Sequence, residues 1–168
     1  MQRKVKPAFD QTLEDNKVRI YRICKIYAVA PIEPEDLFQE VTLHIWRAFP
    51  TFEGRSNVST WIYRIALNVC MNAKSKLENA NEKTIRLESI QFEPVASIPD
   101  TEHQEKYKAL HDCIHVLNTV DQSIVILSLD ELSYKEIAKI TGLTANHIAV
   151  KMKRIRKILL NCITTKLK

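Results

Sequence analysis

The chain has 168 residues, enough for one domain or two small ones, and only two glycines and six prolines. So little turn-forming material disfavours a β-rich protein. No apolar run approaches the roughly 20 residues that cross a bilayer. The start of the chain does not resemble a secretory signal, so we expect a cytoplasmic protein without membrane insertion. The four cysteines are scattered and form no Cys-x-x-Cys pair, which predicts free thiols.

The formal net charge of +5 is distributed unevenly along the chain. Residues 1–80 carry +3, residues 81–130 carry −5 and residues 131–168 carry +7. Two basic blocks that flank an acidic middle could contact nucleic acid at both ends of the chain.

Helical periodicity dominates the first half. The spacing of apolar residues predicts amphipathic helices over about 9–30 and 34–48, separated by a Pro-Ile-Glu-Pro segment. Pro34 suits the first turn of the second helix. We expect that helix to bury Phe38 and Trp46 together with its aliphatic side chains.

A third helix, capped by Ser59 or Thr60 and running to about Leu77, follows a polar stretch. One of its faces mixes aromatic, amide and basic side chains. Aromatic rings can stack on unpaired bases, amides can bond base edges and cations can hold phosphates, so this face suits single-stranded nucleic acid. The aromatic side chains could equally belong to the core. The residues of this face are Trp61, Tyr63, Arg64, Asn68, Asn72, Lys74 and Lys76.

Residues 81–103 lose the helical period and are polar and acidic, which predicts a flexible linker between two domains. A helix over about 104–119 follows, and Asp121 is expected to cap the next helix. No Walker loop, dinucleotide fingerprint or nucleophile elbow occurs, so we predict no enzyme.

A metal site would need a further ligand beside the three candidates on the helix over 104–119. His111 and His115 share a helix face, but Cys113 points elsewhere and no fourth ligand is evident. The sequence therefore predicts neither a metal nor a cofactor.

Residues 132–160 predict two helices around one tight turn. Ser133 and Glu136 form a capping box, Gly142 suits a left-handed C-cap and Thr144 caps the second helix. Such a helix-turn-helix places its second helix in a DNA major groove.

The outward face of that second helix carries side chains that bond bases and phosphates. Asn and Arg can bond base edges with two hydrogen bonds, Val can touch a thymine methyl and Lys suits phosphates. The competing interpretation is a solvated face on an ordinary helical hairpin. The absence of any acidic residue after Glu136 favours DNA. The candidate residues are Asn146, His147, Val150, Lys153, Arg154 and Lys157.

Three segments of the chain together resemble the small sigma factors of bacterial RNA polymerase, of the extracytoplasmic-function type. They are DLFQEVTLHIWRAFPTF, STWIYRIALNVCMN and DQSIVILSLDELSYKEIAKITGLTANHIAVKMKRIRKIL. The resemblance covers roughly residues 10–80 and 105–162. It implies an all-α fold of two small helical domains, over 9–80 and 104–165, joined by a flexible linker over 81–103.

The resemblance also implies roles for particular residues. The first domain would dock on the clamp helices of core RNA polymerase through Asp36, Leu37, Gln39 and Glu40. It would open the minus-ten promoter element and hold the non-template strand through Asn57, Ser59, Thr60, Trp61, Tyr63, Arg64, Asn68 and Asn72. The second domain would bind the minus-thirty-five element as duplex through the outward face described above. Members of this family often have an anti-sigma partner.

Two other functions compete with a sigma factor. A helix-turn-helix repressor or activator would bind duplex operator DNA as a dimer, with half-sites about one helical turn apart. An enzyme with a helical DNA-binding appendage is disfavoured because no catalytic constellation supports it.

Overall fold

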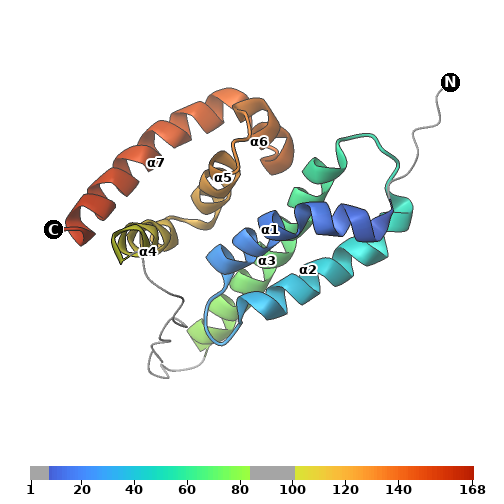
Figure 1. Cartoon of the computed structure of the whole chain (residues 1–168), viewed down its shortest axis with the longest axis horizontal. Coiled ribbons are helices and arrows are strands. Elements are labelled where there is room, and N and C mark those ends of the chain that lie inside the picture. Colours follow the sequence, from blue (N-terminus) through green and yellow to red (C-terminus); the bar gives the residue numbers. More distant parts are fainter. Residues whose placement is uncertain (1–7, 84–100) are drawn as a thin grey trace.

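The computed structural model describes residues 8–83 and 101–168, with side chains over 8–80 and 103–168, and the regular elements of these ranges are all helical. The N-terminal bundle consists of α1 (Phe9–Tyr27), α2 (Pro34–Ala48), the short η1 (Phe49–Thr51) and α3 (Val58–Lys83). The C-terminal bundle consists of α4 (Thr101–His115), α5 (Thr119–Leu129), α6 (Tyr134–Thr141) and α7 (Ala145–Lys166). The expected all-α class is confirmed, and Figure 1 shows the two bundles next to each other. Of the predicted linker, residues 84–100 lie outside the described residues.

The N-terminal bundle forms because each of its three helices carries one apolar stripe, and the three stripes meet. On α2 the stripe is Leu37, Val41 and Ile45, spaced four apart and almost fully buried. Trp46 follows Ile45 by one residue, about 100° further around the helix, and is 59% exposed. Its predicted burial is therefore wrong, and Phe38 is only half-buried.

Two predicted helix caps shift by two or three residues. Asn57 accepts a hydrogen bond from the backbone N–H of Ser59 at 2.9 Å, so Asn57, and neither Ser59 nor Thr60, caps α3. Asn118 accepts from the backbone N–H of Asp121 at 2.9 Å, which places Asp121 in the first turn of α5. In both places an asparagine precedes the residue that we expected, and the side chain of a cap must lie ahead of the helix.

The helix-turn-helix follows the prediction in its capping. Ser133 and Glu136 form a reciprocal capping box at the start of α6. Gly142 ends α6 with φ 78°, a left-handed conformation that costs glycine nothing. The side chain of Thr144 then caps α7 by accepting the backbone N–H of His147 at 3.2 Å.

The two bundles are packed against each other. Their buried apolar residues form one cluster that runs through both bundles. α3 contacts α6, and α1 contacts both α4 and α5. The Tyr27 hydroxyl donates to the backbone oxygen of Thr119 at 2.9 Å, and Lys74 donates to the Gln122 side chain at 3.1 Å.

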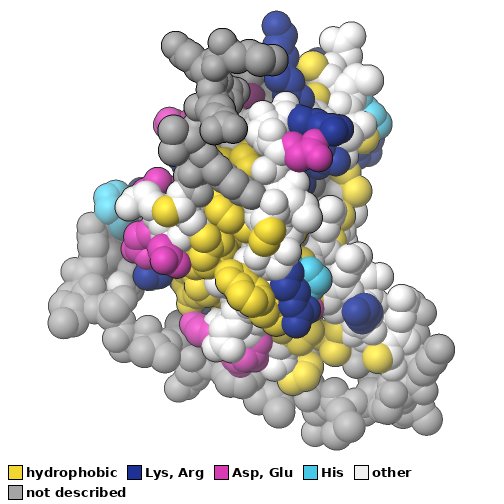
Figure 2. All heavy atoms as spheres, turned by 90° about the vertical axis from the view of Figure 1, so that its right-hand side faces the viewer, with side chains coloured by type: hydrophobic (Ala, Val, Ile, Leu, Met, Phe, Trp, Pro, Cys, Tyr) yellow, Lys and Arg dark blue, Asp and Glu magenta, His cyan; other side chains and the backbone are white. Residues whose placement is uncertain are grey.

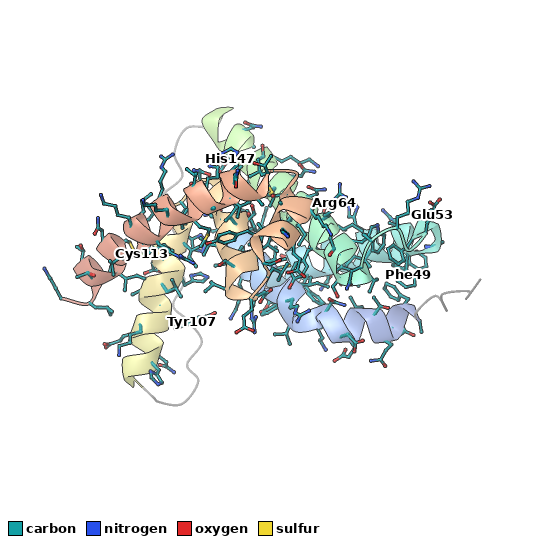
Figure 3. All side chains as sticks on the ribbon, turned by 90° about the horizontal axis from the view of Figure 1, so that it is seen from above. Phe49, Glu53, Arg64, Tyr107, Cys113 and His147 are labelled. Atoms are coloured by element: carbon teal, nitrogen blue, oxygen red, sulfur yellow. A yellow bond between two sulfur atoms is a disulfide. The ribbon has the colours of Figure 1, made fainter. Side chains whose placement is uncertain are left out.

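The cysteines differ from the prediction of four free thiols. Cys113 of α4 and Cys162 of α7 are joined by a disulfide, and Figure 3 labels Cys113 where these two helices meet. Cys24 and Cys70 are free thiols inside the N-terminal bundle. The prediction failed because the spacing of cysteines along a chain does not reveal which of them the fold brings together.

Candidate nucleic-acid and polymerase interfaces

The outward face of α7 is available to a large ligand. All six candidate residues on it are exposed: Asn146, His147, Val150, Lys153, Arg154 and Lys157. Ile148, Met152 and Ile155 lie on the opposite side of α7 and are buried, which fixes the orientation of the helix. α7 packs on α5 and α6 through that side, so its polar face is turned to solvent. Figure 3 labels His147 at the start of the helix.

Lys151 of α7 does not belong to the exposed face but forms an ion pair with α5. Its Nζ lies 2.9 Å from Oδ1 of Asp121, and both side chains are largely buried. This pair ties α7 to the first turn of α5. The sequence signal for this role is the position of Lys151, which lies next to the buried Met152 and outside the polar stripe of α7.

Three of the candidate strand-binding residues form a stripe along α3. Arg64, Asn68 and Asn72 are spaced four apart and exposed, so they lie on one face of the helix. Figure 3 shows the labelled Arg64 near the middle of the molecule, away from the labelled Phe49 and Glu53. An extended strand that follows this stripe would meet one cation and two amides in succession.

Trp61 lies in an aromatic cluster at the start of α3. Its ring centroid is 5.0 Å from that of Phe52 and 6.3 Å from that of Phe49. Phe9 extends the cluster, with its centroid 5.5 Å from Phe49. Trp61 is half-buried, so part of its ring packs against these aromatic side chains and part remains exposed to solvent.

Tyr63 does not lie on the strand-binding face. Its side chain is 4% exposed, and its hydroxyl donates to Oδ2 of Asp130 in the C-terminal bundle at 2.8 Å. Burial raises the pKa of Tyr63, and the hydrogen bond to Asp130 raises it further. The prediction of a base contact is corrected for this arrangement, in which no base can reach the ring. The partner is 67 residues away in sequence, too far for any local pattern to reveal.

Asp130 is the polar centre of the contact between the bundles. Its carboxylate is 2% exposed and pairs with Arg22 of α1 as well as with Tyr63 of α3. A buried carboxylate is stable only with such charged and hydrogen-bonding partners. Asp130 directly follows α5 and precedes the helix-turn-helix by two residues. One side chain therefore joins the segment between α5 and α6 to two helices of the N-terminal bundle.

The polymerase-docking residues predicted on α2 separate into two groups. Asp36, Gln39 and Glu40 are exposed. Leu37 is 1% exposed and belongs to the core, so its predicted partner contact is corrected to a role in holding α2 in place.

An apolar groove beside Gln39 was missed by the sequence analysis. Its volume is about 400 Å³, and Leu43 and Trp46 are exposed in its wall. Figure 2 shows hydrophobic side chains gathered on the side of the molecule that faces away from the C-terminal bundle. The signal for the groove was the position of Trp46, which lies off the buried stripe of α2. The lining residues are Phe9, Phe38, Gln39, Thr42, Leu43 and Trp46.

The histidines of α4 contact each other without forming a metal site. The rings of His111 and His115 are 4.6 Å apart between centroids, and Cys113 is engaged in its disulfide. Among the described side chains, no group of three or more His, Cys, Asp or Glu could hold an ion. Burial lowers the pKa of both histidines. In the same ranges of the chain, none of the helices is long and apolar enough to cross a membrane.

Comparison with protein families gives two separate matches, one in each bundle. Residues 12–79 match the model of Sigma-70 region 2, and residues 107–159 match the model of Sigma-70 region 4. The first range covers the N-terminal bundle, and the second covers most of the C-terminal bundle.

Individual relatives agree with these matches. The ECF RNA polymerase sigma factor SigG of Mycobacterium tuberculosis is 46% identical over 41 residues, which is 24% of this chain and only 11% of the length of SigG. The ECF RNA polymerase sigma factor SigX of Bacillus subtilis is 28% identical over 138 residues, which cover 76% of this chain and 69% of SigX. The sigma factor RpoE, solved in complex with the anti-sigma factor NepR from Bartonella quintana, has the same fold with a TM-score of 0.75. That alignment is 20% identical and covers 93% of this chain and 96% of RpoE.

Proposed function

Because the chain belongs to the extracytoplasmic-function group of the sigma-70 family, we propose that it binds core RNA polymerase and directs initiation at specific promoters. The observation that carries the proposal is the presence of two different nucleic-acid faces in one chain. The α7 face is fully exposed on one side of a helix and suits a duplex groove, and the α3 stripe suits a single strand. We take residues 9–80 and 104–165 as the two functional domains.

The α7 face reads the minus-thirty-five element. Arg154 and Asn146 contact base edges, and Lys153 and Lys157 hold phosphates. His147 lies in the first turn of α7, three residues after the N-cap Thr144, where the helix meets the groove. The Lys151–Asp121 pair positions this helix and does not contact DNA.

The α3 stripe and the loop before it hold the unpaired minus-ten strand. Trp61 supplies a ring for stacking, and Arg64, Asn68 and Asn72 supply polar contacts along the strand. Asn57, Ser59 and Thr60 lie where the loop enters α3 and line the start of this path. The energy of base stacking and polymerase contacts offsets the cost of unpairing, so no nucleotide hydrolysis by this chain is required.

Core polymerase docks on α2. Asp36, Gln39 and Glu40 provide the polar part of the contact, and the adjacent groove with Leu43 and Trp46 provides the apolar part. An exposed tryptophan in an apolar groove is a typical anchor of protein interfaces. The chain itself is not an enzyme and acts in the cytoplasm, where polymerase and promoters are found.

An anti-sigma factor is a further partner of this chain. The relative RpoE forms a complex with the anti-sigma factor NepR. We extend that kind of partner to this chain on the basis of the shared family. A dimeric repressor is not favoured, because it would not need a second nucleic-acid face on α3.

The test is transcription by core polymerase with this chain on a library of promoters. We expect Trp61→Ala to abolish the permanganate reactivity of unpaired thymines near minus ten while duplex binding is retained. Arg154→Ala should relax base preference by about 1–3 kcal/mol at one position of the minus-thirty-five element. Lys168→Ala, at the far end of the chain, is the matched control. A failure of the wild-type chain to start transcription at any promoter would refute the proposal.

A further inference from the structure

The four cysteines form two pairs, one within each bundle, and the two members of each pair lie next to each other. Cys24 and Cys70 lie in the N-terminal bundle with their Sγ atoms 3.9 Å apart, and both remain thiols. Cys113 and Cys162 are bonded across α4 and α7. The fold thus juxtaposes residues that are 46 and 49 positions apart in sequence.

The two pairs differ in how a reagent can reach them. Cys24 and Cys70 are both completely buried, and the hydrogen bond between them and burial raise the pKa of Cys70. Burial and a raised pKa suppress the thiolate that reacts with oxidants. Cys162 is half-buried in the last turns of α7, and Cys113 lies fully buried behind it. An oxidant or a reductant therefore meets Cys162 first.

We propose that the Cys113–Cys162 pair is a reversible redox modification site that sets the stability of the C-terminal bundle. The inference rests on the proposed function in one respect. A protein that works with polymerase stays in a reducing compartment, where disulfides are rare and those that occur are mostly catalytic or redox-sensing.

The reaction with a hydroperoxide proceeds in two steps. The Cys162 thiolate attacks the peroxide, so an S–O bond forms, the O–O bond breaks and the leaving oxygen takes a proton. The Cys113 thiolate then attacks Sγ of Cys162, so the S–S bond forms and hydroxide leaves as water. The two cysteines lose two electrons, and the peroxide gains them. A dithiol reductant reverses the change by thiol–disulfide exchange and is itself oxidised to a disulfide.

The bond matters because it anchors the end of the reading helix. α7 and α4 contact each other closely, and near the bond Lys166 also pairs with Asp112 at 3.3 Å. That ion pair is about 40% exposed on both sides, so it adds little to stability. The cross-link instead restricts the unfolded chain over a separation of 49 residues. Reduction consequently lowers the stability of the C-terminal bundle, including the packing of α4 on the last turns of α7.

α4 also lies next to the N-terminal bundle. Together with α1 and α5 it lines a pocket of about 330 Å³ that includes Arg22, Lys25, Leu110 and His111. A loosened α4 would change this contact as well. The redox state of one bond in the C-terminal bundle therefore affects the contact between the two bundles.

The experiment uses the full chain without polymerase or DNA. The chain is equilibrated with glutathione buffers of increasing oxidised fraction, and with hydrogen peroxide followed by thioredoxin, and its thiols are then counted by maleimide-polyethylene-glycol shift in denaturant. We expect four reactive thiols when reduced and two when oxidised, the remaining two being those of Cys24 and Cys70. We expect the oxidised chain to melt about 10 °C or more above the reduced one.

Two variants make the result specific. Cys162→Ser, at the half-buried position, should abolish both the thiol change and the melting difference, and Cys70→Ala should retain both. Four reactive thiols after oxidation, a bond that thioredoxin cannot reduce, or equal melting temperatures would each overturn the proposal. The redox titration of the wild-type chain decides the matter even if a variant misfolds. A failed promoter assay beside a normal titration would reject only the proposed function.

Discussion

The two bundles are stabilised in different ways. In the C-terminal bundle α5, α6 and α7 each begin with a side-chain cap, from Asn118, Ser133 and Thr144. In the N-terminal bundle the N-cap positions of α1 and α2 are Ala8 and Glu33, and neither side chain forms a capping hydrogen bond. A side-chain cap gives a partner to a free N–H group of the first turn, whereas a helix without such a cap depends more on packing along its apolar stripe. Local sequence therefore specifies the C-terminal bundle more directly.

The faces that we propose for nucleic-acid binding differ in how far they depend on the rest of the fold. The α7 face is wholly exposed, because one side of a surface helix suffices to present it. On α3 the stripe of Arg64, Asn68 and Asn72 is exposed, but Tyr63 is covered by the C-terminal bundle. A face that lies near another bundle depends on tertiary contacts, and inspection of one helix cannot define it.

Removal of core volume from the C-terminal bundle should have the largest effect. Ile155 is fully buried on the inward side of α7. Ile155→Ala should lower the free energy of unfolding by about 2–5 kcal/mol, measured by urea denaturation followed by circular dichroism. Ile158→Ala on the same helix is the control, because Ile158 is exposed and should change stability little. Equal losses from the two variants would contradict the assigned orientation of α7.

Loss of the buried carboxylate should weaken the contact between the bundles. Asp130→Ala leaves the Tyr63 hydroxyl without its acceptor and Arg22 without its partner, which should cost about 1–3 kcal/mol. Small-angle scattering should then report a larger radius of gyration. Tyr63→Phe should give a smaller change, and Tyr21→Phe, which removes a hydrogen bond within the N-terminal bundle, should leave the radius unchanged. An unaltered radius in Asp130→Ala would exclude a central role of this carboxylate.

The difference in capping can be tested with one pair of serines. Ser133→Ala removes the cap of α6 and should cost about 1 kcal/mol in urea denaturation. Ser59→Ala is the matched control in the N-terminal bundle, because Asn57 caps α3, and it should stay within about 0.5 kcal/mol of wild type. A larger loss at Ser59 than at Ser133 would reverse the comparison.

Acid should weaken the packing of α4, which contacts helices of both bundles. Burial lowers the pKa of His111 and His115, so below pH 6.5 the unfolded chain binds more protons than the folded chain. The free energy of unfolding therefore rises with pH through this window. The contribution of the two neutral histidines is lost as the pH falls from 7 towards 5. The double variant His111→Gln with His115→Gln should flatten this slope in urea denaturation, whereas His147→Gln on the exposed face should preserve it. A slope that survives the double variant would assign the acid sensitivity to other groups.

The sequence was sufficient for much of the fold and for the exposure of the candidate residues on α7. Periodicity predicted α2 to its ends, and the motif from Ser133 to Thr144 predicted the helix-turn-helix with its caps. Both signals are local, since a helix repeats every 3.6 residues and a cap acts over three. The boundaries of α3 and α4 were less accurate, because a side-chain cap or a neighbouring helix shifts an end by several residues.

The remaining features arise from contacts between distant residues. Cys113 meets Cys162, and Tyr63 meets Asp130, only after folding has brought their helices together. Trp46 was assigned to the core from its hydrophobicity, although its helical position placed it outside the stripe. The geometric period was a better guide than residue type at this position, and it would have revealed the groove on α2.

Asp130 has a consequence for how the two ends of the chain cooperate. A ligand that withdraws its carboxylate from Tyr63 uncovers an aromatic ring and, in the same event, releases the reading unit from α3 and α1. By thermodynamic reciprocity, a strand that binds only when the bundles are apart favours their separation, and separation raises the affinity for that strand by the same factor. A single acidic side chain thus makes the affinities of the two halves interdependent.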